Sequence, residues 1–338
     1  MKYIFLIFFY SIAAIASPPK DLDSWGVFSN DEGVFKITKT HHIYKLNTPL
    51  FSDYAQKIRT IHIPQGKKIQ VFKKEFIFPV GTIISKTFYY DPDQIGKEEG
   101  IDGPWGKQKY LIETRILQKG NDGWTPFVYQ WDMNTRSAYY WPYGNKKELK
   151  YKEEEFSYFI PDKNQCMSCH VSFKDFDKII KPLGPSSILN FNFKNQIIRF
   201  KKLGLMAENI NPPTEAFPIW NEPQTGDLEA RAKDYLHTNC AHCHSPDGPA
   251  ANTGLYLEYK RKNSRKRGFC KTPVAPGIGS GGRPFAIFPG KPKESILTFR
   301  VRSRKLAIMM PEIGRDLTHK EGVDLVGKWI ESLPGDCH

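Results

Sequence analysis

The chain has little cysteine and histidine, and after its first sixteen residues it has no long apolar run. Only 6 of its 338 residues are cysteine and 9 are histidine. Low-complexity tracts and fixed-period repeats are also absent, which excludes repeat architectures. Without a later apolar run, we expect no membrane-spanning helix in the body of the chain. The length and the balanced composition indicate a globular protein with room for two domains of ordinary size.

The single apolar run, residues 1–16, is typical of a cleaved export signal. Lys2 provides a minimal positive end, residues 3–12 are apolar, and Ala14-Ile15-Ala16 has the small-x-small pattern of a cleavage site. The run is too short to cross a bilayer comfortably, although an uncleaved membrane anchor remains the alternative. We therefore expect a soluble periplasmic protein that begins near Ser17.

Four of the six cysteines lie in two pentapeptides, residues 166–170 and 240–244, and both read C-x-x-C-H. We call them the first and the second motif. This is the haem c attachment signature, in which two thiols capture the porphyrin vinyl groups and the adjacent imidazole binds the iron. The sequence thus predicts two covalently bound haem c groups. The predicted attachment residues are Cys166, Cys169, Cys240 and Cys243, and the predicted iron ligands are His170 and His244.

The opposite face of the second haem has a natural ligand in Met310, which Pro311 follows. A thioether ligand stabilises ferrous iron and raises the redox potential. The adjacent Met309 is an alternative ligand, and both methionines could instead fill a core.

The first motif has no comparable partner, so an open face that admits a small molecule such as nitric oxide is the alternative. The scattered candidates for its second ligand are His41, His42, His62, Met133 and Met206. We expect His242, inside the second motif, to be a spacer that faces solvent.

The two cysteines outside the motifs, Cys270 and Cys337, are predicted to form a disulfide. In an oxidising compartment a leftover pair usually becomes bonded, and the alternative is two free thiols. Such a bond would stabilise the fold by roughly 2–4 kcal/mol.

The net charge is +13, and the densest basic run is residues 260–267. This run is either a solvated loop or a surface that steers an acidic redox partner or an anionic membrane surface toward the protein. Because an exported haem protein does not normally meet DNA, we expect no nucleic-acid partner.

Strand patterns dominate residues 48–158, and helical patterns follow later. Residues 60–63, 70–72, 81–90 and 110–117 are rich in alternating, β-branched or aromatic side chains. They predict an antiparallel β-rich domain over residues 48–175 that ends in the first motif, after an N-terminal extension over residues 17–47. Residues 176–223 are expected to be a linker with one helix around residues 195–205.

Residues 224–338 have the element order typical of a class I cytochrome c domain. A helix over residues 227–237 would lead into the second motif, and Thr318 with Glu321 would form a capping box that opens a terminal helix. The predicted fold class is therefore a multidomain α+β chain, in which an antiparallel β-rich haem domain precedes an all-α class I cytochrome c domain.

Read end to end, the chain resembles a family of exported bacterial di-haem c-type cytochromes. The first domain resembles the cytochrome c-prime-beta group in its order of elements, a sheet followed by C-x-x-C-H. In a related β-rich group a strand lysine is cross-linked to the haem and supports hydroxylamine oxidation. Lys86 is the strand lysine here; we expect it to be solvent-facing or salt-bridged, and a haem cross-link is the alternative. Glu113 and Arg115 are expected to form an ion pair. The segments that carry the likeness are residues 47–57, 78–82, 86–88, 113–115, 166–170, 182–185, 239–244, 289–292 and 309–315.

These observations predict a periplasmic electron carrier rather than an enzyme. It would pass single electrons between an exported dehydrogenase or membrane quinol complex and a terminal acceptor. The alternative is a haem enzyme or gas-binding protein that uses an open face at the first haem for peroxide, hydroxylamine or nitric oxide chemistry.

Overall fold

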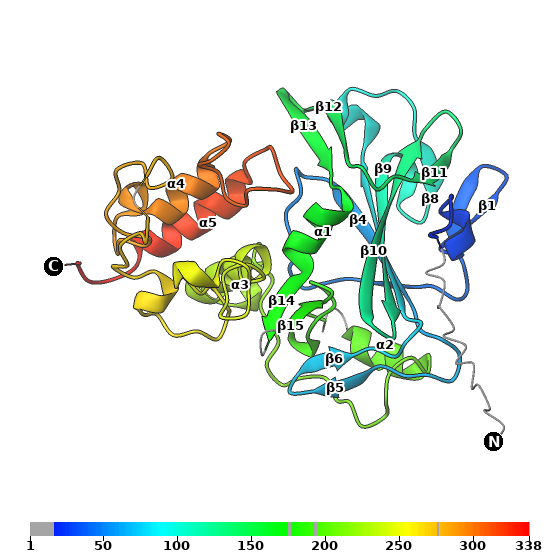
Figure 1. Cartoon of the computed structure of the whole chain (residues 1–338), viewed down its shortest axis with the longest axis horizontal. Coiled ribbons are helices and arrows are strands. Elements are labelled where there is room, and N and C mark those ends of the chain that lie inside the picture. Colours follow the sequence, from blue (N-terminus) through cyan, green and yellow to red (C-terminus); the bar gives the residue numbers. More distant parts are fainter. Residues whose placement is uncertain (1–16, 175–176, 192–194, 276, 338) are drawn as a thin grey trace, which may run out of the picture.

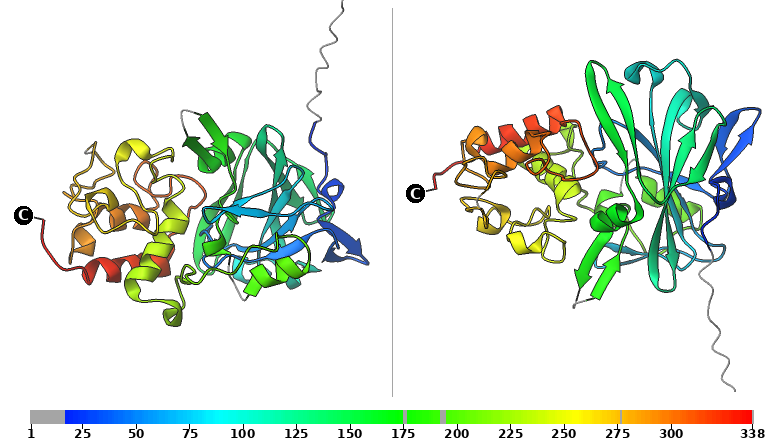
Figure 2. Two further views of the ribbon diagram at one scale, coloured as in Figure 1. Left: turned by 90° about the horizontal axis from the view of Figure 1, so that it is seen from below. Right: turned by 45° about the horizontal axis from the view of Figure 1, so that its top comes forward.

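The computed structural model describes residues 17–174, 177–191, 195–275 and 277–337. The predicted export signal lies outside these ranges. Figure 1 shows a lobe built on a curled β-sheet and a second lobe that contains the last three α-helices, with α1 and the β14–β15 hairpin between them. Figure 2 shows the same arrangement from two further directions. Within the described ranges, no helix combines the length and apolar content needed to cross a bilayer.

Nine strands form the main sheet, in the order β1-β2-β8-β9-β7-β4-β3, with β10 and β11 continuing from β9. Their bounds are β1 (Phe28–Asp31), β2 (Val34–Ile37), β3 (His42–Tyr44), β4 (Gln56–His62), β7 (Ile83–Tyr90), β8 (Ile101–Gly103), β9 (Gly106–Gly120), β10 (Gly123–Asp132) and β11 (Ser137–Tyr140). The sheet is mixed, because β2 and β8 pair in parallel. The prediction of an antiparallel sheet is therefore wrong for this pair, which joins β2 of the predicted N-terminal extension to β8.

Three hairpins and two helices surround this sheet. The hairpins are β5 (Gln70–Phe72) with β6 (Glu75–Ile77), β12 (Asn145–Tyr151) with β13 (Glu154–Ile160), and β14 (Val171–Lys174) with β15 (Asp177–Ile180). The helices are α1 (Lys163–His170), which contains the first motif, and α2 (Gln196–Lys202). The β12–β13 hairpin contributes Phe156, Tyr158 and Ile160 to the apolar cluster that also holds Phe88 and Cys166. The first motif is thus packed against one face of the sheet.

The predicted all-α class I cytochrome c domain is not found, and the predicted fold class is wrong. Strands hold more of the described chain than helices do. Among the described residues of the predicted second domain, 224–338, the α-helices are only α3 (Leu228–Cys240), α4 (Ile296–Arg302) and α5 (Lys320–Glu331). Between α3 and α4 the described chain runs mainly as turns and single 3-10 turns. Frequent glycine and proline in this stretch explain the result, since both residues oppose helix formation.

The helices of the second lobe share one small core. Ala232 and Leu236 on α3 pack against Val326, Trp329 and Ile330 on α5. This core fixes the end of α3, which is where the second motif begins.

The expected capping box before α5 is also absent, because both of its residues bond elsewhere. The Thr318 hydroxyl donates to the carbonyl of Arg302 at 2.9 Å, and the Glu321 carboxylate accepts from the Tyr54 hydroxyl at 2.8 Å. His319 stands at the N-cap but its side chain does not cap the helix; its Nδ1 lies 3.0 Å from the Tyr235 hydroxyl instead.

The disulfide between Cys270 and Cys337 is present, as predicted. It joins the loop that follows the basic run to the C-terminal segment.

Candidate functional site

The first motif lies on α1, and a reciprocal pair of hydrogen bonds starts this helix. The Gln165 N–H donates to the Asp162 carboxylate at 2.8 Å, and the Asp162 N–H donates to the Gln165 side chain at 3.1 Å. This is a capping box. Because residues three apart lie on one helix face, α1 presents Cys166 and Cys169 on the same side.

His170, the last residue of α1, has the hydrogen bond expected of an iron ligand. Its Nδ1 lies 2.8 Å from the carbonyl oxygen of Lys181. A carbonyl can only accept, so Nδ1 carries the proton and Nε2 keeps its lone pair for a metal. Burial lowers the pKa of His170 to about 3, which keeps the ring neutral at ordinary pH.

The second motif forms a tight turn at the end of α3. The N–H groups of Cys243 and His244 both donate to the carbonyl of Cys240, at 3.1 and 2.8 Å. The Nδ1 of His244 lies 3.5 Å from the Thr253 hydroxyl, and burial lowers the pKa of this histidine. Each motif therefore pairs two thiols with a neutral imidazole whose Nδ1 has a polar neighbour.

The four thiols of the motifs are unbonded, in contrast to Cys270 and Cys337. Burial raises the pKa of Cys166 to about 11 and that of Cys240 to about 12. A C-x-x-C pair that exchanges disulfides has a thiol pKa well below the ordinary value. The thiols thus fit covalent capture of a haem better than redox catalysis.

The two motifs lie side by side, although 69 residues separate them in the sequence. The Phe173 N–H donates to the carbonyl of Asp247 at 2.8 Å, which joins the strand after the first motif to the loop after the second. After burial, the nearby Cys169 is the next cause that raises the pKa of Cys243. The charge of His242 likewise acts on the pKa of His170. The sequence carried no signal for this juxtaposition.

Met310 lies in the loop between α4 and α5, and this loop lies near the second motif. Its N–H donates to the carbonyl of Arg300 at 3.0 Å, and the charge of Arg300 is among the causes that lower the pKa of His244. Met309 is buried, with 5% of its surface exposed, whereas Met310 is half-buried. The assignment of Met310 as the iron ligand stays a prediction.

Arg315 organises the Met310 loop, a role that sequence reasoning missed. Its buried guanidinium donates to the carbonyl of Met310 at 2.7 Å and to those of Ser303 and Val301 at 2.9 and 3.1 Å. Only the unusual Met-Pro-Glu-Ile-Gly-Arg segment could have pointed to it.

The structure brings none of the predicted second ligands of the first haem to α1. His41 is buried with Nδ1 3.1 Å from the Thr60 hydroxyl, and its ring packs on that of His62. His42, on β3, has its pKa lowered by burial and then by Arg199. Met206 and Met133 pack into two other apolar clusters than the one that contains Cys166.

Lys86 and His242 lie near the first motif, and both differ from expectation. Lys86 is half-buried and has no ion pair in the described part of the chain, so it is neither solvent-facing nor salt-bridged. His242 is half-buried rather than a solvent-facing spacer, and its buried Nδ1 has no hydrogen-bond partner among the described residues. The charge of Lys86 acts on the pKa values of both His170 and His242.

The predicted ion pair of Glu113 and Arg115 is confirmed, with Nε and Oε2 2.8 Å apart. Glu113 is fully buried and also accepts a hydrogen bond from the Tyr158 hydroxyl at 2.8 Å.

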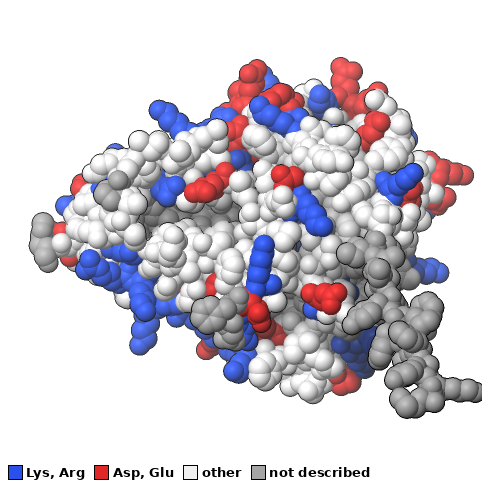
Figure 3. Space-filling model, in the orientation of Figure 1, with Lys and Arg blue, Asp and Glu red and all other residues white. Residues whose placement is uncertain are grey.

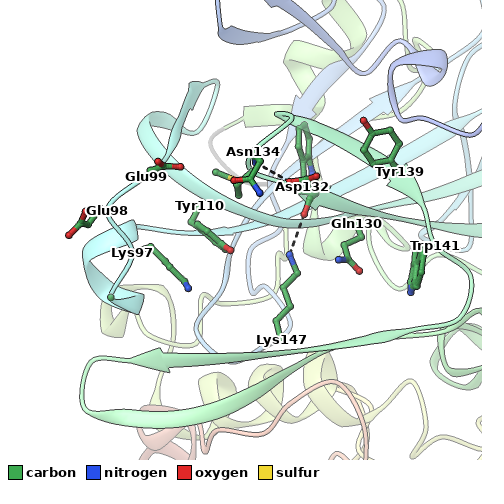
Figure 4. Close-up of a pocket in the computed structure, with 13 residues that line it drawn as sticks. Lys97, Glu98, Glu99, Tyr110, Gln130, Asp132, Asn134, Tyr139, Trp141 and Lys147 are labelled. Carbon is green, nitrogen blue, oxygen red and sulfur yellow. Dashed lines mark hydrogen bonds between the residues drawn. The ribbon is translucent and has the colours of Figure 1, made fainter.

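A separate open groove of about 900 Å³ lies beside β10 and contains no residue of either motif. Figure 4 shows Tyr139 and Trp141 on one side of this groove and Lys97 and Tyr110 on the other. Lys147 enters from β12 and donates to the carbonyl of Trp131 at 3.2 Å.

Comparisons with protein-family models, curated proteins and solved structures found no match to the chain. Among the described residues, no three His, Cys, Asp or Glu side chains form a cluster that could hold a metal ion. A haem needs no such cluster, because the porphyrin supplies the equatorial ligands of its iron and the protein supplies only the axial ones. The donor set of each motif, two thiols and an imidazole with a free Nε2, fits haem c.

Proposed function

We propose that this protein is an exported di-haem c-type cytochrome that passes single electrons between redox partners in the periplasm. The observation that carries the proposal is the proximity of the two motifs, since the segments that follow them are joined by the hydrogen bond from Phe173 to Asp247. A bound haem would supply one-electron chemistry of its iron. Haems attached at adjacent motifs would lie within tunnelling range of one another, so that an electron entering at one could leave from the other.

In this proposal the chain's own residues attach, orient and shield the two haems. Cys166, Cys169, Cys240 and Cys243 hold the porphyrins. The Lys181 carbonyl fixes the ring of His170, and Arg315 fixes the backbone that presents Met310.

The charge of the surface supports an acidic partner. Six residues of the basic run, Lys260, Lys262, Asn263, Ser264, Arg265 and Lys266, are exposed. Arg267 is instead fully buried and donates to the carbonyl of Glu258 at 2.8 Å, so the run is a structured loop whose outer side is basic. Figure 3 shows Lys and Arg side chains projecting from the lower edge of the second lobe. We propose an acidic redox protein as partner, with peripheral membrane association as a second use of the same charge.

Magnetic resonance of the oxidised protein tests the proposal. Two neighbouring ferric haems should couple magnetically and broaden each other's signals. The variant Cys166→Ala with Cys169→Ala should lose one haem and sharpen the signal of the other. A control variant, Cys270→Ser with Cys337→Ser, should keep both haems and the coupled spectrum. Two haems with independent signals in the wild-type protein would contradict electron exchange through adjacent sites.

A second candidate function is catalysis or gas binding at the first haem. The observation that favours it is that the contacts of His41, His62, Met133 and Met206 are with residues other than those of α1. An iron without a second protein ligand would bind carbon monoxide in its ferrous form. Stoichiometric binding at one haem would favour this candidate, and two low-spin haems that bind none would exclude it.

A further inference from the structure

Three cations lie in one row across the sheet, next to the first motif. In the register of β4, β7 and β9, Arg59 pairs with Lys86 and Lys86 pairs with Arg115. We call these three residues the cationic row. Directly opposite residues on antiparallel strands project from the same face with their Cβ atoms about 5 Å apart, where like charges repel. Such a row is therefore unfavourable unless an anion balances it.

Only one member of the row has an anionic partner. Arg115 pairs with the buried Glu113, at 2.8 Å from Nε to Oε2. Lys86 and Arg59 have no hydrogen bond or ion pair in the part of the chain that the structure describes, and Arg59 is only 8% exposed. Two positive charges are thus removed from bulk water without a bonded anion, which is costly. Glu113, which is bonded to Arg115, is the carboxylate whose charge acts on the pKa of Lys86.

The ring of Phe88 lies near these cations, but its attraction is too weak to offset their burial and mutual repulsion. The Nζ of Lys86 lies 5.1 Å from the ring centre of Phe88, and the guanidinium of Arg115 lies 4.4 Å from it. Lys57 adds a third cation at 5.6 Å, and its Nζ also donates to the carbonyl of Ala55 at 2.9 Å. Cation–π contacts contribute only a small part of what a paired carboxylate would. Burial, followed by the charges of Arg115 and Arg59, lowers the pKa of Lys86 to about 7.

The row also lies within electrostatic reach of both motifs. Cys166 is among the charges that act on the pKa of Lys86, and Lys86 in turn lowers the pKa of His170 and of His242. A ligand held by the row would therefore lie beside the first haem and close to the second.

We propose that the cationic row is an anion site, which binds a carboxylate or a small planar oxyanion beside the two motifs. A guanidinium binds such groups through two parallel hydrogen bonds, and an ammonium adds a point charge. Because Arg59 is buried and Lys86 is half-buried, an acidic protein surface cannot reach the whole row, so the proposed ligand is small. The ligand has two sources: a propionate of the first haem, which rests on the proposed function, or a free oxyanion such as nitrite.

Calorimetric titration of the purified protein with nitrite tests the free-anion source. The wild-type protein should bind one nitrite at the row, and Lys86→Gln and Arg59→Gln should each weaken binding by about tenfold or more, the usual effect of losing a hydrogen bond to a charged group. Lys86→Arg should retain binding. The matched control is Lys107→Gln, which removes an exposed lysine from the same strand as Arg115.

Resonance Raman spectra test the propionate source on the same preparations. If a propionate occupies the row, the wild-type protein binds no nitrite, and the propionate bending modes shift in Lys86→Gln and Arg59→Gln but not in Lys107→Gln. Equal nitrite affinity in all variants, or no nitrite binding together with unmoved propionate modes, would overturn the anion site.

Two further readouts separate this proposal from others. Intact mass of each preparation reports haem content, so a chain without haem contradicts the proposed function while the nitrite titration still tests the row.

Thermal unfolding in anion-poor buffer reports the repulsion among the cations of the row. Lys86→Gln should be at least as stable as the wild-type protein there, and nitrite should stabilise it less; a variant that fails to fold in that buffer would count against uncompensated charge.

Discussion

At the scale of single residues, the neighbouring methionines Met309 and Met310 have different surroundings. Met309 is buried, whereas Met310 is half-buried in a loop whose backbone is held by Arg315. Buried methionine usually fills a core, while a ligand must reach a cofactor. The sequence favoured Met310 as the iron ligand only because a proline follows it. The structure adds that Met310, unlike Met309, is not buried in a core.

We therefore predict that Met310→Ala converts the second haem from low-spin to high-spin, because the iron loses its thioether ligand. Optical and magnetic resonance spectra of the ferric protein measure the change. Met309→Leu, which conserves side-chain volume, should cost less than about 1.5 kcal/mol and leave the spectrum unchanged. If instead Met309→Leu gave the high-spin form and Met310→Ala did not, the ligand assignment would be reversed.

Asp234 predicts a pH-dependent stability. It is fully buried on α3, and neither carboxylate oxygen has a hydrogen-bond partner among the described residues; the nearby Thr48 hydroxyl donates instead to the carbonyl of Pro218. Burial raises its pKa from 3.8 to about 7. Since the folded state then binds the proton more tightly than the unfolded state does, stability rises as the pH falls from above 7 toward 4.

Asp234→Asn should remove this dependence. We expect the variant to be more stable than the wild-type protein by roughly 2–4 kcal/mol at pH 8, and the difference to vanish near pH 4. Urea unfolding at a series of pH values measures it. Asp324→Asn, at an exposed carboxylate on α5, is the control and should change little. A wild-type stability that does not vary between pH 4 and 8 would refute a buried ionisable Asp234.

At the scale of elements, the sequence predicted the secondary structure of short segments well where local interactions determine it. The helix expected over residues 227–237 is α3, and Asp227 is its N-cap, accepting from the Ala230 N–H at 2.7 Å. The expected strand at residues 70–72 is β5, and α2 lies within the helix expected around residues 195–205. Each of these depends on periodicity or a cap that is visible in the sequence.

The predictions failed where contacts between residues distant in the sequence determine the structure. Thr318 bonds to Arg302 rather than capping α5, and β2 pairs in parallel with β8 across a large sequence separation. The prediction of an all-α second domain was wrong because it inferred the fold from the order of the motifs. The glycine- and proline-rich chain between α3 and α4 does not favour helices. The cationic row needs the register of three strands, which the sequence alone does not provide.

The disulfide is the strongest covalent constraint on the second lobe. We predict that Cys270→Ser with Cys337→Ser lowers the free energy of unfolding by roughly 2–4 kcal/mol, because the bond closes a long loop in the unfolded chain. Chemical unfolding with and without reductant measures the loss, and the variant should keep both haems. An unchanged stability would mean that the bond does not form in the purified protein.

At the scale of the whole molecule, the two lobes are held together by contacts that also place the motifs. The Asp53 carboxylate of the first lobe accepts the N–H groups of Asp316 and Leu317 at 2.8 and 2.7 Å, and the Asn239 side chain accepts the Phe51 N–H at 2.9 Å. With the contact from Phe173 to Asp247, these bonds fix α1 beside the end of α3. The chemistry of each motif was visible in the sequence, but their proximity arises only from this docking.

Intact-mass measurement of the exported protein tests the central claim most directly. The account predicts the mass of the chain without residues 1–16, increased by two haem groups that survive denaturation. Replacing Cys240 and Cys243 with alanine should remove one of these two increments, and replacing Cys166 and Cys169 as well should remove both. A denatured wild-type protein with the mass of the bare polypeptide would contradict haem attachment, and the proposed electron transfer with it.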